Sequence, residues 1–201
     1  NNLNLNGSYP VLIEKFLENA IELDVDLIRD GNKTWIAGIL EHKEKAGIHS
    51  GDSTCVIPPF SLPQDLVSEI MRQACQLADA LEVIGLMNIQ FAIQDNQIYI
   101  LESNLRASRT VPFISKAIGL PIAKIATRCV LGESLEKQGV TRYITPKEIC
   151  IKFPIFVFDK FKGADKTLGP EMRSIGEVMG KGVDLQTAYS KFSCEAWESI
   201  Y

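Results

Sequence analysis

The sequence predicts an α+β fold in which a mostly antiparallel sheet is flanked by helices. Apolar and acidic residues alternate from Ile21 to Ile28, as in a half-buried strand, and turn residues at 30–32 precede a second strand-like run. Between Pro63 and Glu82 the apolar residues recur at helical spacing instead. A second hairpin pattern occupies 88–103. Strands joined by short turns pair antiparallel, so these segments predict hairpins beside a long helix.

The first hairpin and the helix have the clearest patterns. The returning strand reads TWIAGILEHKE, and the next segment, 46–63, is rich in Gly, Ser and Pro, which predicts an ordered loop around a short strand. The helix that starts at Pro63 carries an apolar stripe, which we interpret as core. Its members are Leu66, Ile70, Ala74, Leu77, Ala78 and Leu81.

The rest of the chain alternates between strand-like and helical patterns. Two strand-like runs are joined by Asp95-Asn96-Gln97, and 104–112 leads into a second helical region that ends near Gly132. A strand-like run follows at 147–161. The segment 168–182 contains too many glycines for one uninterrupted element.

Composition limits the classes of protein that this chain can belong to. It has 201 residues, of which 46% are hydrophobic and 23% charged, enough for one large domain or two small ones with a core. The formal net charge is −4 and no cluster of Lys and Arg stands out, which argues against a nucleic-acid surface. A few local cations can still bind an anionic small molecule.

The cysteines and the chain start bear on compartment. The cysteines are odd in number and have no Cys-x-x-Cys spacing, so we interpret them as reduced core thiols of a cytoplasmic protein: Cys55, Cys75, Cys129, Cys150 and Cys194. No apolar run approaches the roughly 20 residues of a membrane span, and the first ten residues resemble no signal peptide. The chain does not begin with Met, and we expect a segment of a longer protein.

The stretch YILESNLRASRTVPFISK places charge at the end of a core-like strand. Residues two apart share a face of a strand, so Glu102, Asn104 and Arg106 should point the same way. Carboxylate and amide oxygens suit Mg²⁺, and the planar guanidinium suits phosphate oxygens. Gln90, on the preceding strand, is the natural further ligand. If Gln90 lies opposite Glu102, the turn centres on Asn96 and the loop contains an odd number of residues.

An isolated triplet of this kind has another interpretation, a solvated strand end with a surface ion pair. The apolar run 99–101 before the triplet and Arg109 shortly after it favour a binding site instead, because charge placed beside a core needs partners. His42 is expected to be a structural hydrogen-bonding residue, with a cation site as the alternative.

Three separated motifs carry a family resemblance. They are EHKEKAGIHSGDSTCVIPP, the long segment from NIQFAIQ to LGESL, and LGPEMRSIGEVMG. Together they resemble ATP-grasp enzymes, and more closely the large subunit of carbamoyl phosphate synthetase, from Pro10 to about Gly182. The resemblance implies the C-terminal lobe of an ATP-grasp fold at 1–145 and an extension packed on it at 146–201. The N-terminal lobe is expected to lie outside this chain.

The resemblance also implies a reaction. The words TVPFISK and LGPEMRSIGEVMG resemble the half of the large subunit that phosphorylates carbamate to carbamoyl phosphate, for arginine and pyrimidine biosynthesis. The half that phosphorylates bicarbonate is the alternative. Two further alternatives are another ATP-grasp carboxylate ligase, such as a biotin carboxylase, and a noncatalytic nucleotide-binding module.

Site residues, cofactors and partners follow from the same resemblance. Gln90, Glu102 and Asn104 match metal positions, and Arg106 and Arg109 match phosphate or acyl-phosphate positions. Nucleotide positions fall on Lys15 and Leu17 beside the adenine, Glu22 at the ribose or a monovalent cation, and Ile48, His49 and Ser50 along the pocket. The implied cofactors are ATP and Mg²⁺ or Mn²⁺, with K⁺ as a further cation. The implied partners are a glutaminase subunit or fused glutaminase domain and the remaining large-subunit domains, with no nucleic acid and no membrane.

Overall fold

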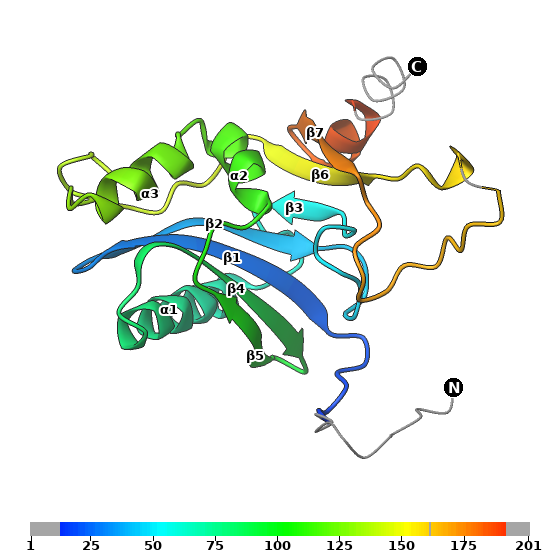
Figure 1. Ribbon diagram of the computed structural model, residues 1–201, viewed down its shortest axis with the longest axis horizontal. Helices are drawn as coiled ribbons and strands as arrows, with labels where there is room; N and C mark the ends of the chain where they lie inside the picture. The colour runs from blue at the N-terminus through cyan, green and yellow to red at the C-terminus, as the bar shows by residue number, and fades with distance from the viewer. Residues whose placement is uncertain (1–12, 161, 192–201) are drawn as a thin grey trace.

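The computed structural model describes residues 13–160 and 162–191, and within them one seven-stranded antiparallel sheet forms the centre of the molecule (Figure 1). The strand order is β5-β4-β1-β2-β3-β6-β7, so the expected α+β class is confirmed. The strands are β1 (Ile21–Asp30), β2 (Thr34–His42), β3 (Cys55–Ile57), β4 (Ile84–Gln94), β5 (Gln97–Asn104), β6 (Ile149–Ile155) and β7 (Gly176–Gly182). The labelled helices are α1 (Gln64–Ala80), α2 (Thr110–Ile118) and α3 (Ile122–Val130), with a 3-10 turn at Phe158–Lys160. The described residues 185–191 are also helical.

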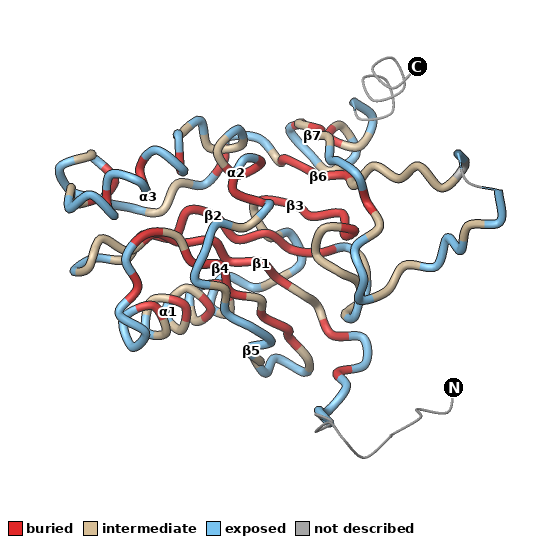
Figure 2. The backbone as a smooth tube through the Cα atoms, viewed as in Figure 1, coloured by how far each residue is buried: buried red, intermediate tan, exposed pale blue. Residues whose placement is uncertain are grey.

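Helices cover the two faces of the sheet unequally (Figure 1). The alternation in β1 sends Leu23, Val25 and Leu27 into a buried cluster with α1. The opposite face packs against α2 and α3 through a second cluster that includes Ile28. In Figure 2 the central strands are coloured mostly as buried, whereas β5, at one edge of the sheet, is largely exposed. Asp24 and Asp26 alternate along β1 with the residues that face α1, so they lie on the face that α2 and α3 partly cover.

The predicted helix at 63–82 is confirmed as α1, but three of the six residues predicted for its buried stripe are not fully buried. Val67, Ile70, Ala74 and Ala78 are buried, whereas Leu66 and Leu77 are only partly buried. Leu81 lies just beyond the helix and is 43% exposed, so its assignment to the core was wrong. The stripe follows the i, i+3, i+4 geometry set by the contact with the sheet.

The second helical region is two helices rather than one. Gly119 has φ +72°, the left-handed conformation that ends α2, and Pro121 precedes the first residue of α3. Both helices contribute to the cluster that includes Ile28, through residues such as Ile114 and Ile125.

The C-terminal part of the described chain extends the same sheet. β6 pairs with β3, where Val56 faces Ile151, and β7 pairs with β6. Between them, the described residues 156–160 and 162–175 extend away from the sheet, at the right of Figure 1, and the Gly-rich motif becomes a strand only from Gly176. No helix in the described part of the chain is long and apolar enough to cross a membrane. Cys194 lies outside the described residues.

Candidate functional site

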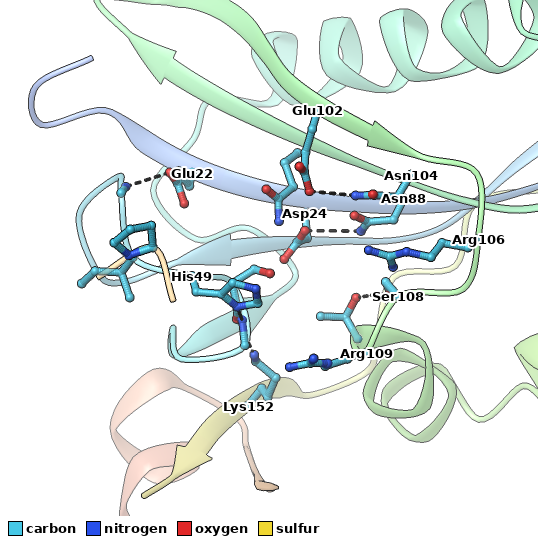
Figure 3. Close-up of a pocket in the computed structure, with 17 residues that line it drawn as sticks. Glu22, Asp24, His49, Asn88, Glu102, Asn104, Arg106, Ser108, Arg109 and Lys152 are labelled. Atoms are coloured by element: carbon cyan, nitrogen blue, oxygen red, sulfur yellow. Dashed lines mark hydrogen bonds between the residues drawn. The ribbon is translucent and has the colours of Figure 1, made fainter. Parts of the chain in front are cut away.

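A cavity of about 340 Å³ opens on the sheet face that α1 does not cover (Figure 3). Strands β1, β4, β5 and β6 form its floor, and the loop that contains His49 forms one wall. The residues that line it are Glu22, Asp24, Gly47, Ile48, His49, Ser50, Gly51, Asn88, Gln90, Glu102, Asn104, Arg106, Ser108, Arg109, Thr110, Lys152 and Pro170.

The floor of the cavity is built from rows of side chains that cross neighbouring strands. Asp24 lies opposite Gln90, which lies opposite Glu102. The next row joins Asp26 and Asn88 in the same way and continues to Asn104 on β5. Paired residues share a face of a sheet, so donors from three strands converge here.

The predicted pairing of Gln90 with Glu102 is confirmed, but the predicted odd-numbered loop is wrong. Gln94 faces Gln97 across a two-residue turn at Asp95 and Asn96, both with positive φ. A register shift between Gln90 and Phe91 compensates for that turn, because one extra residue of β5 bulges out of the ladder.

Oxygen donors gather at the β5 side of the cavity. The Asn104 amide donates to Glu102 Oε1 at 2.8 Å, and Glu102 is exposed toward the cavity opening. Gln90 lies beside them in the row described above. Carboxylate and amide oxygens on adjacent strands are the donor set that Mg²⁺ or Mn²⁺ prefers, so these residues fit a hard divalent cation.

Two buried carboxylates, Asp24 and Asp26, belong to these rows. The Asn88 amide nitrogen is 3.3 Å from Asp24 Oδ1 and 3.3 Å from Asp26 Oδ1, and the Thr110 hydroxyl donates to Asp26 Oδ2. Burial and the negative charge of Asp24 raise the pKa of Asp26 to about 7. The hydrogen bond from Thr110 to Asp26 joins the first residue of α2 to the centre of the sheet.

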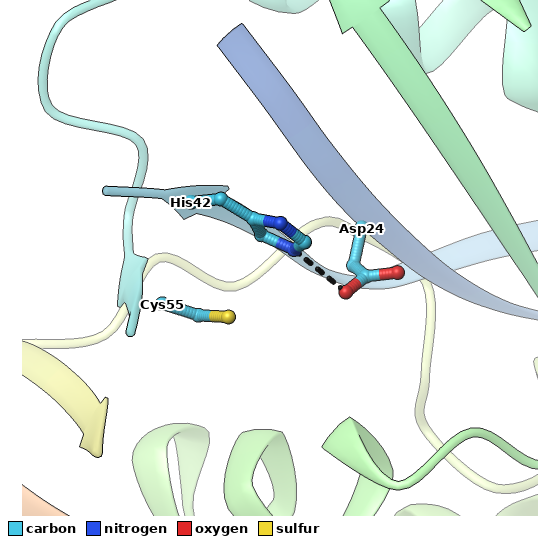
Figure 4. Close-up of side chains that lie close together, drawn as sticks. All are labelled: Asp24, His42 and Cys55. Atoms are coloured by element: carbon cyan, nitrogen blue, oxygen red, sulfur yellow. Dashed lines mark hydrogen bonds and ion pairs between the residues drawn. The ribbon is translucent and has the colours of Figure 1, made fainter. Parts of the chain in front are cut away.

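Asp24 also contacts His42, beside Cys55 (Figure 4). His42 Nε2 lies 2.9 Å from Asp24 Oδ2, and His42 Nδ1 lies 3.4 Å from Glu22 Oε2. Burial would lower the pKa of His42, but Cys55 and the two carboxylates outweigh it and raise that pKa well above its usual range. Burial would likewise raise the pKa of Asp24, but His42 and Asn88 lower it. The structural role expected for His42 is consistent with this ion pair.

The loop with His49 is clamped to the segment before β7. The buried carboxylate of Asp52 accepts hydrogen bonds from the backbone N–H groups of Arg173 and Ser174, both at 2.8 Å. The His49 N–H donates to Gly169 O at 2.8 Å, and the Gly47 N–H donates to Glu22 Oε1 at 3.0 Å. These bonds hold a wall of the cavity, with Pro170, against the sheet.

Three cations line the cavity, Arg106, Arg109 and Lys152. Arg106 follows β5, and its Nη1 donates to the Ala107 carbonyl at 3.0 Å. Arg109 directly precedes α2. Lys152 comes from β6 and donates from Nζ to the Ser50 carbonyl at 2.9 Å. Such a set of cations can bind phosphate or carboxylate oxygens beside the metal-type donors.

The structure brings together all the site residues predicted from the sequence except Lys15 and Leu17. Leu17 is buried against Ala20 and Ala92, and Lys15 Nζ lies 5.9 Å from the centre of the Tyr99 ring. Neither lines the cavity, and their contact with an adenine stays a prediction.

Sequence reasoning missed Asp24, Asn88 and Lys152. A signal existed for the first two, because each shares a strand face with a predicted neighbour two residues away, Glu22 and Gln90 respectively. Lys152 is a single charge within the apolar strand β6, which is also a usable signal, although nothing local shows that this strand reaches the cavity.

Comparison with known proteins identifies the family. The model of the carbamoyl-phosphate synthase L chain ATP-binding domain matches residues 4–138. Carbamoyl phosphate synthase large chains are similar over most of this chain. The one from Neisseria meningitidis serogroup A is 53% identical over 95% of the chain, that of Pasteurella multocida 53% over 98%, and that of Vibrio cholerae 50% over 94%. The chain spans 18% of the length of each of these relatives.

A solved structure supports the fold independently. The biotin carboxylase domain of a single-chain bacterial carboxylase aligns with 70% of this chain and 33% of its own, with a TM-score of 0.60 and 18% identity. The expected ATP-grasp lobe is therefore confirmed at the level of the fold. Taken with the match over residues 4–138, the chain belongs to the family of the carbamoyl-phosphate synthase L chain ATP-binding domain.

Proposed function

We propose that this chain forms the metal- and phosphate-binding wall of a carbamoyl phosphate synthase large chain and acts in the phosphorylation of carbamate. The observation that carries the proposal is one cavity in which Glu102, Asn104 and Gln90 lie together with Arg106 and Arg109. Hard oxygen donors beside guanidinium groups are what a metal-bound nucleoside triphosphate requires.

The proposed chemistry is transfer of the terminal phosphoryl group of ATP to a carboxylate-type oxygen of carbamate. The bond between that phosphorus and the bridging oxygen breaks as the new P–O bond forms, and ADP leaves. A divalent cation, when bound, neutralises charge on the phosphates. Arg106 and Arg109 bind the equatorial phosphoryl oxygens, and no side chain needs to act as a nucleophile.

Sequence motifs favour the carbamate half over the bicarbonate half. TVPFISK forms most of α2, directly after Arg109, and LGPEMRSIGEVMG includes Pro170 in the cavity wall and the residues clamped by Asp52. The same resemblance supports ATP with Mg²⁺ or Mn²⁺, K⁺ near Glu22, and assembly with the other large-chain domains and a glutaminase. Synthesis would then serve the arginine and pyrimidine pathways.

The test uses the complete large chain that contains this segment. In Glu102→Gln, formation of ATP from ADP and carbamoyl phosphate should fall about 100-fold or more, because a ligand charge is lost from the metal site. Hydrolysis of ATP stimulated by bicarbonate should persist. Glu69→Gln is the matched control, since Glu69 is paired with Arg72 on α1, on the other face of the sheet.

The bicarbonate half and the noncatalytic module give different results. Loss of the bicarbonate-stimulated reaction with ATP formation preserved would assign the chain to the bicarbonate half. Normal rates for both reactions in Glu102→Gln, with magnesium dependence unchanged, would favour the noncatalytic module and refute the proposed role of Glu102.

A further inference from the structure

Lys152 is a fully buried cation at the cavity, only 1% exposed. It lies in a row with Cys55 of β3, which in turn lies opposite His42 of β2, so all three project on the cavity face of the sheet. Of its three ammonium protons, the described residues account for one hydrogen bond, to the Ser50 carbonyl at 2.9 Å. The side chain lines the cavity beside that bond (Figure 3).

A buried ammonium group is costly unless it is paired. Among the ion pairs of the described residues, none includes Lys152. Asp24 and Glu177 lie close enough for electrostatic interaction with it. Asp24, however, is already paired with His42, and Glu177 also faces Lys116 and Arg109. The charge of Lys152 is therefore incompletely neutralised within this part of the protein.

Arg109 approaches the same short stretch of backbone as Lys152. Its Nη1 lies 3.2 Å from the point that a Cβ on Gly51 would occupy, next to the Ser50 carbonyl that Lys152 contacts. Figure 3 shows both cations on the side of the cavity away from Glu102 and Asn104. Two cations that approach the same stretch of backbone can both bind the oxygens of one anionic ligand.

We propose that Lys152 is a catalytic residue that, with Arg109, binds the phosphoryl group in transit, as the acyl phosphate of product or the terminal phosphate of ATP. This inference rests on the proposed function and adds a residue to it. Metal-type donors hold one side of the phosphates and the two cations hold the other. Because the phosphoryl group spreads charge over its oxygens during transfer, a fixed ammonium stabilises that state more than water does.

A structural role is the competing explanation, since the bond to Ser50 also fixes the loop that carries His49. Two substitutions separate the roles. Lys152→Gln keeps a donor for the Ser50 carbonyl and removes the charge, whereas Lys152→Met removes both. Lys116→Met is the matched control, because Lys116 also faces Glu177 but lies outside the cavity. The measurement is ATP formation from ADP and carbamoyl phosphate by the complete large chain, with KM determined for each substrate.

We expect both Lys152 variants to lose about 10- to 100-fold in kcat/KM for carbamoyl phosphate, with KM for ADP within about twofold of the parent value. The control should keep parental values. Normal kinetics in Lys152→Gln, or a rise in KM for ADP equal to that for carbamoyl phosphate, would overturn the inference and leave a loop-positioning role. Failure of Glu102→Gln to affect ATP formation would instead refute the proposed function, so the two failures are distinguishable. If Lys152→Met fails to fold, Lys152→Gln decides alone.

Discussion

Gln90 and Glu102 lie directly opposite each other on β4 and β5, although the two-residue turn between these strands would by itself set them on opposite faces. The register shift beside Gln90 reverses the alternation of β5. Before the shift, Ile98 and Ile100 face Ile93 and Phe91, on the side of α1. After it, Glu102 faces the cavity. One bulged residue thus lets the same strand supply both the core and the site.

This relationship predicts that the ligand charge can be moved across the strand pair. Glu102→Gln should reduce phosphoryl transfer about 100-fold, and Gln90→Glu combined with Glu102→Gln should recover about tenfold of that loss, because the carboxylate then reaches the same cation from the opposite strand. Rates measured at several magnesium concentrations check this. A double variant no more active than Glu102→Gln, with the same magnesium dependence, would show that the two side chains do not share an ion.

The raised pKa of Asp26 predicts that the stability of the protein declines as the pH rises. Its folded pKa of about 7 lies above that of an unfolded Asp, so between those values the folded protein holds a proton that the unfolded chain has lost. Stability from this group therefore falls as the pH rises through that window. Asp26→Asn removes this titration. The free energy of unfolding of the variant, relative to that of the parent, should therefore increase by about 3 kcal/mol as the pH rises from about 5 to about 8. Urea unfolding at several pH values measures it, and a parallel pH dependence for both proteins would contradict it.

Because His42 forms an ion pair with Asp24, replacing His42 should lower the free energy of unfolding more than replacing His49. His42→Asn should cost about 3 to 5 kcal/mol near pH 6, because Asp24 and Glu22 are left without their cation. The folded pKa of His42 is raised, so this stabilisation is complete below the unfolded pKa and is lost as the pH rises through the folded one. His49→Asn serves as the control. His49 lines the cavity, and that variant should lose activity with little change in unfolding free energy.

Replacing Asp52 should let the cavity wall that it holds open locally. Asp52→Asn should cost about 2 kcal/mol and speed hydrogen exchange of the Arg173 and Ser174 amides, which lose a charged acceptor. Burial would raise the pKa of Asp52, but its bonds with Ser174 and Arg173 lower it, so the clamp should hold above the unfolded pKa and weaken as the pH falls through the folded one. Unchanged exchange at these two amides would mean that the clamp contributes nothing.

The isolated chain of 201 residues is predicted to fold and to bind Mg·ATP weakly. The two large buried clusters supply a core of their own. The site residues, in contrast, line a cavity that opens on one face of the sheet. We expect a Kd in the high micromolar range, roughly 10⁻⁴ M or weaker, and little or no turnover with carbamate or bicarbonate. Isothermal titration and an assay of ADP release check both. Tight binding with sustained turnover would contradict this prediction.

The sequence by itself determined the elements and most of the site. Alternation marked β1, the helical period marked α1, and the spacing of Glu102, Asn104 and Arg106 put three functional groups on one strand face. These signals are local, because a strand or helix exposes its two sides at a fixed period along the chain. Resemblance to a known family extended them to residues such as Glu22 and His49.

Only the tertiary structure decided which distant groups meet. Lys152 reaches the cavity because β6 joins the sheet through β3, and Asp52 reaches the backbone of Arg173 more than a hundred residues later. The turn at Asp95 and Asn96 was mispredicted because a bulge elsewhere in the hairpin offsets it. Register is a property of two strands and of everything packed on them, so one unpaired residue changes which side chains share a face without leaving a periodic trace in the sequence.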